Sequence, residues 1–425
     1  MLKRHPRGLS VLFFTEMWER VGFYTLMAIL VLYMDREFAW ADGRKADVYG
    51  LFLGLCYFVP LLGGWLGDRV WGPLRTIRIG AALMACGYVA LALSSRQRPA
   101  SFFAGLLLIA IGTGVFKVNM SVTLGRLYAG RAELKDTAFN IFYMGVNVGA
   151  MIAPLLATLN SVVFHSYTLS FWIAAAGLLL AQLILALGRK HLGDGKPQPS
   201  RGRQPAGAAP APGDRGEEAR RIVTLLALFA IVIFFWVSYY QNGFALTLFA
   251  ERSTRRLPLL RPETYQFFPP FFILLLTPAL LALFARLRAR RREPSTPLKI
   301  LLGMGIMIAA NLVMVQACLG GGNRDANVMS PAWLIGTYLV VTLAEILISP
   351  MGQSFVSKVA PPRVQGLMMG GWFAATALGS YGSGLVGKWY GSMPHHRYFL
   401  LLTAMIALAI ILLLASYRYL KRYAD

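Results

Sequence analysis

The stretch FFTEMWERVGFYTLMAILVLYM, residues 13–34, is apolar and aromatic, yet it contains Glu16, Glu19 and Arg20 in its first half. As a helix it is long enough to cross a bilayer, whose hydrocarbon core takes about 20 apolar residues to span. An ionisable side chain at such depth is costly and usually faces the interior of a helix bundle or a wet cavity. The stretch therefore predicts a membrane-spanning helix whose charges act inside the protein.

The composition of the whole chain agrees with a lipid environment. Of the 425 residues, 56% are hydrophobic and 14% are charged, whereas soluble domains carry about 25% charged residues. The net charge of +23 would suit a nucleic-acid binder if the basic residues formed a patch, but most of them lie between long apolar runs. Cys56, Cys86 and Cys318 each lie inside an apolar run, so neither a disulfide nor a metal site is predicted. The predicted partner is the lipid bilayer, not a nucleic acid.

Further apolar runs of spanning length follow the first one. The predicted helices, about twelve in number, are centred on residues 10–34, 48–71, 75–94, 102–126, 137–159, 167–187, 222–249, 264–287, 297–318, 331–353, 364–388 and 398–417. The first helix is expected to stay in the mature protein, because charges interrupt it where a cleavable signal peptide would have a short uniform apolar core.

A polar segment rich in Pro, Gly, Ala and charge occupies residues 188–221. It has too little apolar surface to fold by itself. We therefore predict an N-terminal six-helix bundle at 1–187, a flexible cytoplasmic linker at 188–221 and a C-terminal six-helix bundle at 222–425. Transporters are often built from two such halves, with a substrate site near the bilayer midplane.

The distribution of Lys and Arg over the short loops predicts the orientation. If twelve helices alternate, most basic loops fall on one side, including RLRARRR at 286–292, and that side is expected to be the cytoplasm. Both termini are then cytoplasmic. The segment ERSTRR at 251–256 is a basic exception on the opposite side.

Other charges occur at similar depth in the predicted helices. Glu16, Glu19 and Arg20 have i, i+3 and i+4 spacing and so share one helix face, while Lys117 lies in the first half and Glu345 in the second. A structural ion pair between helices is one interpretation. The alternative is functional, since opposite charges in the two halves suit a zwitterionic substrate and a buried carboxylate driven toward neutrality suits a proton carrier.

Several motifs now point to a known family. The chain contains EMWERVGFY at 16–24, GGWLGDRVWGPLR at 63–75, GTGVFKVN at 112–119, FNIFYMGVNVGA at 139–150, AEILISPMG at 344–352 and GLMMGGWFAATALG at 366–379. Together they resemble the proton-dependent oligopeptide transporter (POT/PTR) family of the major facilitator superfamily. This resemblance implies an all-α membrane protein with twelve transmembrane helices in two six-helix bundles, the major facilitator fold.

The resemblance also implies roles for individual residues. The proton-coupling residues would be Glu16, Glu19, Arg20, Lys117 and Glu345. The substrate-binding residues would be Arg20, Tyr24, Tyr57, Lys117, Asn147, Glu345 and Trp372, with Arg20 and Lys117 at the carboxyl end of a peptide and Glu345 and Asn147 at its amino end. Asp68 and Arg69 would latch the cytoplasmic gate.

Some of these residues have other interpretations, and the chain departs from the family pattern. Tyr57 and Trp372 could be core aromatics, and Asn147 could join helices by hydrogen bonding. In the family a second Arg usually follows the first motif where this chain has Met27, and a Glu usually stands where it has Tyr240. Pro269 replaces the Asn that helps to hold a peptide amino group, and Phe23 replaces a Tyr of the first motif.

The resemblance and the charge pattern predict a proton-coupled symporter that imports di- and tripeptides by alternating access. It would work as a monomer in the bacterial inner membrane, with protons as coupling ions and no other cofactor. A transporter of another anionic or zwitterionic molecule is the alternative, followed by a membrane receptor or scaffold that does not transport. An enzyme is not expected, because HExxH, G-x-S-x-G and Walker A motifs are absent from the sequence.

Overall fold

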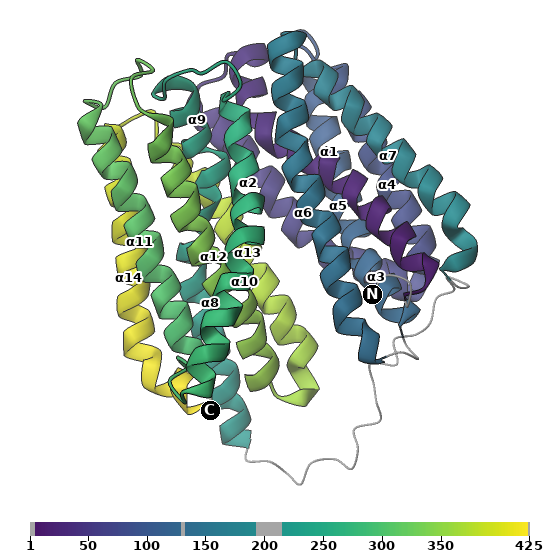
Figure 1. The fold of residues 1–425 in the computed structure, drawn as a ribbon, viewed down its shortest axis with the longest axis vertical. Helices are drawn as coiled ribbons and strands as arrows, with labels where there is room; N and C mark the ends of the chain where they lie inside the picture. The colour runs from purple at the N-terminus through teal and green to yellow at the C-terminus, as the bar shows by residue number, and fades with distance from the viewer. Residues whose placement is uncertain (1–4, 129–131, 193–214, 424–425) are drawn as a thin grey trace. The chain divides into compact units, whose positions relative to one another are not determined.

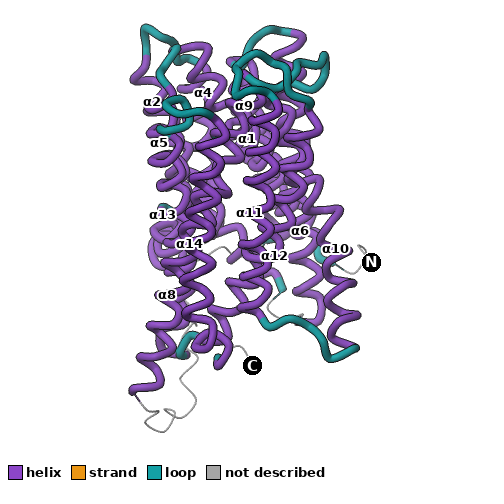
Figure 2. Tube along the Cα trace, turned by 90° about the vertical axis from the view of Figure 1, so that its left-hand side faces the viewer, coloured by secondary structure: helices purple, strands orange, loops and turns teal. Residues whose placement is uncertain are grey.

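The computed structural model describes residues 5–128, 132–192 and 215–423, and this part of the chain is almost entirely helical. Figure 2 shows helix as the dominant structure, with loops mainly at the helix ends. Within the described residues, extended pairing is limited to two isolated bridges, Ser95 with Arg98 and Thr254 with Met329. The predicted all-α fold class is confirmed.

The long helices follow the predicted apolar runs. They are α1 (Arg7–Phe38), α4 (Pro73–Ala92), α5 (Pro99–Leu127), α6 (Ala132–Val163), α7 (Thr168–Gly188), α8 (Arg215–Tyr239), α10 (Phe268–Ala289), α11 (Thr296–Gly320), α12 (Pro331–Val359), α13 (Gln365–Gly387) and α14 (His395–Arg422). Among the described residues, 11 helical segments are long and apolar enough to cross a membrane. Helix α13, which has 23 residues and is rich in Gly and Ser, falls outside that set and matches the predicted run at 364–388.

Two of the predicted runs are broken in the structure. The run at 48–71 divides into α2 (Asp42–Phe58), α3 (Pro60–Leu66) and a π-helical segment (Gly67–Trp71). Proline interrupts the backbone hydrogen-bond ladder, which accounts for the break at Pro60. The run at 222–249 divides into α8, a 3-10 turn (Tyr240–Gly243) and α9 (Ala245–Arg252). Breaks inside spanning helices commonly occur where backbone lines a site or a cavity.

The chain forms two compact units. The first contains the described residues of 1–40, 55–204 and 258–270, and the second those of 41–54, 205–257 and 271–425. In the first unit α1 packs against α6 and α7, and α4 packs against α5 (Figure 1). In the second unit α11 packs against α12 and α14, while α8 packs against α13.

The compact units and the predicted halves differ at two segments. Residues 41–54 precede the predicted linker yet pack in the second unit, and residues 258–270 follow it yet pack in the first. The second segment includes a 3-10 helix, η5 (Pro262–Phe267). Most of the predicted linker, residues 193–214, lies outside the described residues. The division at 1–187, 188–221 and 222–425 therefore stays a prediction.

Candidate functional site

Helix α1 carries a cluster of buried charges at the spacing that the sequence predicted. Glu16, Glu19 and Arg20 are exposed by only 2%, 0% and 2% of their surfaces. The Arg20 guanidinium donates from Nε to Oε2 of Glu19 and from Nη2 to Oε1 of the same residue, the latter at 2.7 Å. Its Nε also lies 3.4 Å from Oε1 of Glu16. One guanidinium thus contacts both carboxyl groups, so a single positive charge serves two groups that can each carry a negative one.

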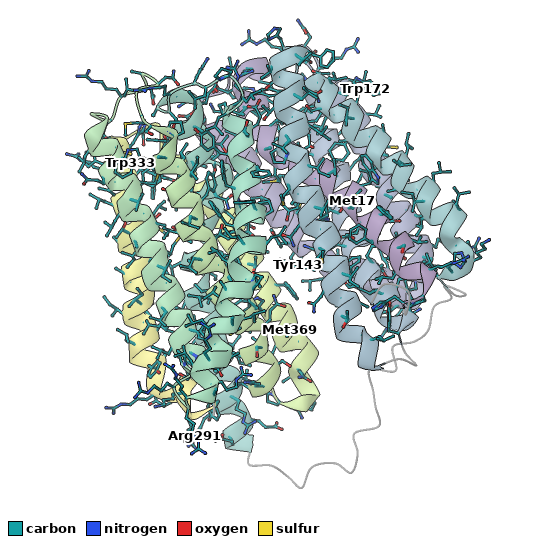
Figure 3. The ribbon with its side chains drawn as sticks, in the orientation of Figure 1. Met17, Tyr143, Trp172, Arg291, Trp333 and Met369 are labelled. Carbon is teal, nitrogen blue, oxygen red and sulfur yellow. The ribbon has the colours of Figure 1, made fainter. Side chains whose placement is uncertain are left out.

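Close packing of α1 and α6 fixes this cluster. A Cβ added at Gly149 would lie 2.5 Å from the carbonyl oxygen of Met17 and 2.9 Å from Cβ of Arg20. Glycine on α6 therefore lets the two backbones approach beside the cluster, as small residues do in closely packed membrane helices. Figure 3 labels Met17 on α1 and Tyr143 on α6.

Three further predicted site residues of the first unit are Lys117, Tyr57 and Tyr24. The Lys117 side chain is exposed, and its Nζ lies 5.9 Å from the ring centroid of Tyr57, a cation–π distance. Within the described residues Lys117 is not within ion-pair distance of Glu16 or Glu19, and Oε2 of Glu16 has no hydrogen-bond partner. Tyr24 is half-buried, at the turn of α1 that follows Arg20.

Asn147 lies on α6 and is buried. Its side-chain amide donates to the carbonyl oxygen of Tyr143, one turn earlier, at 2.9 Å. This bond lies within α6, so the structure gives no sign of the interhelical hydrogen bond that was the alternative interpretation.

In the second unit, Glu345 forms no ion pair with another described residue. Glu345 on α12 is partly exposed and receives a hydrogen bond from Tyr239 of α8. Its Oε2 is buried and has no partner among the described residues. An unsatisfied carboxylate oxygen inside a spanning helix is a strong acceptor for a cationic ligand group.

Trp372 on α13 is packed inside the second unit. It is 1% exposed, and its ring occupies the space that a Cβ at Gly352 would need, at 1.9 Å from Cη2. Its ring also lies edge-on to Phe229, with centroids 6.5 Å apart. In this conformation Trp372 contacts core residues, and a role as a pocket wall stays a prediction.

The departures from the family pattern occupy ordinary positions. Met27 is partly exposed on α1, Tyr240 is 7% exposed in the 3-10 turn after α8, and Pro269 is the second residue of α10. The carbonyl oxygen of Tyr240 accepts a hydrogen bond from Tyr49 at 3.1 Å. None of the three side chains offers a charge to a ligand.

The predicted gating residues lie in the π-helical segment. Oδ1 of Asp68 lies 3.6 Å from Nη2 of Arg126 near the end of α5, and both side chains are about one-third exposed. Arg69 is exposed. Asn119 of α5, which sequence reasoning missed, contacts α3 just before this segment: its buried amide donates to the carbonyl oxygen of Gly63 at 2.9 Å. The signal was available, because Asn119 is a polar residue two positions after Lys117 in an apolar helix.

The described residues contain no group of three or more His, Cys, Asp or Glu side chains that could hold a metal ion. Long apolar helices with buried, partly unsatisfied charges of both signs are the features of a multi-pass membrane transporter.

Comparison with known proteins assigns the family. The signature of the POT family (PTR2) matches residues 74–211 and 209–398. The chain belongs to the POT family and is a transporter, not an enzyme.

The sequences of individual relatives align with most of the chain. It is 30% identical to the peptide transporter YePEPT of Yersinia enterocolitica, with 90% of this chain and 88% of that protein covered. It is 29% identical to the di-/tripeptide transporter of Lactococcus lactis subsp. cremoris, with 87% and 86% covered. A crystal structure of a peptide transporter POT in complex with sulfate superposes with a TM-score of 0.88 at 28% identity, covering 99% of this chain and 96% of that one.

Proposed function

We propose that this protein is a proton-coupled symporter that imports short peptides by alternating access. The observation that carries the proposal is the set of charges within the spanning helices: a buried α1 cluster of two carboxyl groups and one guanidinium, an exposed Lys117, and a Glu345 carboxyl group with one unpaired oxygen. Buried charge without use is a standing cost, which argues against a receptor or scaffold. Relatives named as a peptide transporter and as a di-/tripeptide transporter support the substrate class.

Arg20 and Lys117 are proposed to bind the carboxyl end of a peptide. Because Arg20 already contacts Glu19 and Glu16, a substrate carboxylate would compete with them for the guanidinium. Protonation of one glutamate removes that competition. Substrate and proton binding to the cluster would then favour each other, which is the requirement for symport.

Glu345 and Asn147 are proposed to bind the amino end. The free Oε2 of Glu345 supplies an acceptor for an ammonium group, and Glu345 would carry a proton when no ammonium is bound. Tyr24 and Tyr57 would donate hydrogen bonds to the peptide, and Trp372 would wall the pocket after a change in its packing. Asp68, with Arg69 beside it, would latch the cytoplasmic gate through Arg126.

A second candidate substrate follows from Pro269, which offers no side-chain donor or acceptor where the family usually has Asn. A weaker amino-end site would favour an anionic or zwitterionic molecule other than a peptide. Competition between free and N-acetylated dipeptides separates the two candidates. The peptide proposal expects the free dipeptide to compete far better and Glu345→Gln to erase much of that difference, and equal competition in the wild type would overturn it.

Transport itself is tested in proteoliposomes with an inward proton gradient. The wild type is expected to accumulate dipeptide only with the gradient, without any added cofactor. Glu19→Gln and Lys117→Gln should each abolish accumulation while leaving peptide exchange, since exchange moves no net protons. Glu37→Gln, on the same helix at its exposed end, is the matched control and should keep accumulation. Wild-type pH dependence in the first two variants would assign the cluster a structural role.

The proposed setting is the bacterial inner membrane, with both termini cytoplasmic and one chain as the working unit. Arg291 lies in the basic run at 286–292 and is exposed (Figure 3). A cysteine at this position, in a background lacking the native cysteines, should resist a membrane-impermeant thiol reagent in intact cells. Labelling from outside would overturn the orientation.

A further inference from the structure

Another buried carboxyl group lies on the segment 258–270, outside the site described above. Glu263 is in the 3-10 helix η5, close before α10, and is 0% exposed. Sequence reasoning placed this residue at the edge of a loop. Burial of a carboxyl group this complete is rare unless the group is paired or carries out a function.

The partners of Glu263 are hydroxyl groups of the first unit. Its Oε1 accepts a hydrogen bond from the hydroxyl of Ser161 on α6, and its Oε2 accepts one from the hydroxyl of Tyr167, just before α7, at 3.1 Å. A further hydrogen bond between η5 and α6 joins two neutral groups: the hydroxyls of Thr158 and Thr264 lie 2.7 Å apart. The segment is therefore attached to α6 by one titratable contact and one that cannot titrate.

No cation neutralises this carboxyl group by direct contact. Among the described residues Glu263 forms no ion pair within 4.0 Å, and the charged group whose field reaches it is Arg36 of α1. Arg36 is exposed and its guanidinium lies over the Tyr167 ring, 4.6 Å from the centroid. A fully buried carboxylate without a counter-ion is costly, whereas a protonated carboxyl group needs only hydrogen bonds.

The hydroxyl of Ser161 can serve either protonation state. Besides Glu263, it reaches the carbonyl oxygen of Thr158 at 3.0 Å. If Glu263 is protonated, its O–H donates to Oγ of Ser161, and the Ser161 hydrogen turns to the Thr158 carbonyl. Every polar group then keeps a partner without any movement of the backbone.

We propose that Glu263 is a proton-binding site separate from the α1 cluster, and that its proton stabilises the attachment of segment 258–270 to α6. The groups that face it are Ser161 of α6, Tyr167 before α7 and Arg36 of α1. When Glu263 loses the proton, the buried charge weakens the attachment. Its part in the transport cycle rests on the proposed function: alternating access moves one half of the protein against the other, and this contact joins sequence from both sides of the linker.

Thermal unfolding of the purified protein in lipid nanodiscs, without substrate, tests the site. A contact stabilised by a proton contributes fully at low pH and is lost as the pH rises. Between pH 5 and pH 8.5 the wild-type Tm should therefore fall relative to that of Glu263→Gln, which stays neutral, by on the order of 2–4 °C. The matched control Thr158→Val should lower Tm equally at every pH and keep the wild-type slope.

Infrared difference spectra between the same two pH values provide a second measurement that does not depend on stability. The wild type and Thr158→Val should lose a protonated-carboxyl band at high pH that Glu263→Gln lacks. A wild-type Tm that runs parallel to that of Glu263→Gln, or an unchanged band in that variant, would overturn the proposal. Neither measurement involves transport, so either result stands apart from the peptide-uptake assay.

Discussion

Segments 41–54 and 258–270 are held in their respective units by opposite chemistry. In the second unit, Asp42 at the start of α2 accepts two hydrogen bonds from Arg252 of α9, at 2.8 and 2.7 Å, and its Oδ1 lies 2.8 Å from Nζ of Lys45. In the first unit, segment 258–270 is held by the hydroxyl groups around Glu263 and by the Thr158–Thr264 bond.

The difference shows how each attachment would respond to protons. Asp42 lies between two cations and stays ionised at neutral pH, so its contact needs no proton. Glu263 has only neutral hydroxyl partners, and the contact that it makes depends on its proton. The protein thus combines a permanent electrostatic attachment with a titratable one.

The largest expected effect is the loss of the ionic attachment. Asp42→Asn removes the carboxylate that Arg252 shares with Lys45, which is 0% exposed. Breaking such a buried pair costs about 3–5 kcal/mol, and the partial exposure of Arg252 favours the lower end. The measurement is Tm in nanodiscs. The matched control is Asp47→Asn, whose pair with Lys388 is half exposed and should change stability by less than about 1 kcal/mol. Equal losses would erase the distinction between the two contacts.

Backbone packing in the same segment gives the next largest effect. Gly50 of α2 and Gly384 of α13 touch directly: a Cβ on Gly384 would lie 2.4 Å from the carbonyl oxygen of Ala46 and 2.7 Å from Cα of Gly50. Gly384→Ala should therefore cost roughly 1–3 kcal/mol by overpacking. Gly305→Ala on α11, where no atom lies within 4 Å of the added Cβ, should leave Tm unchanged or raise it. A tolerated Gly384→Ala would mean that segment 41–54 is loosely held.

Much of the fold could be predicted because hydrophobic length and helical spacing are local properties. The apolar runs became helices, and Glu16, Glu19 and Arg20 came together because positions three and four apart share a helix face. The basic exception ERSTRR also has an explanation: Arg252 in that segment pairs with Asp42, a residue that sequence reasoning assigned to a loop.

The rest depended on tertiary contacts that spacing does not reveal. Glu263 lies beside the start of a predicted helix, and its burial follows from the packing of η5 on α6. Likewise, the sequence did not show that Lys117 would face Tyr57 while Arg20 contacts both glutamates. The sequence shows which residues carry charge, but the partner of each charge depends on the tertiary fold.

Removing the hydroxyl that donates to Oε2 of Glu263 should have a smaller effect on stability. Tyr167→Phe keeps the ring under Arg36 and removes the donor to Glu263, which should cost about 1 kcal/mol. Tyr33→Phe is the matched control, since the Tyr33 hydroxyl makes a neutral contact with Ser94 at 2.8 Å. Both variants should lower Tm at pH 5, but only Tyr167→Phe should alter its pH dependence. Identical pH profiles would count against a titratable contact at Glu263.

The smallest effect on the pH dependence of Tm is expected at a third carboxylate, which forms ion pairs at the end of two helices. Glu293, between α10 and α11, accepts hydrogen bonds from Arg288 at 2.5 Å and Lys299 at 2.6 Å. The bond from Arg288, and then that from Lys299, lowers the pKa of Glu293 from 4.5 to about 2. Its stabilising contribution is therefore complete above pH 4.5 and is lost as the pH falls toward 2. Arg288 is largely exposed and adds little to stability, whereas Lys299 is buried. Glu293→Gln should lower Tm by the same amount at pH 5 and pH 8.5, since both values lie above the pH range in which Glu293 titrates. A wild-type Tm that changes with pH over this range, together with a Glu293→Gln variant of the same slope, excludes the Glu293 ion pair as the source of the change. A flat slope in Glu293→Gln would instead place the titrating group in the exposed ion pair and remove the contrast with Glu263.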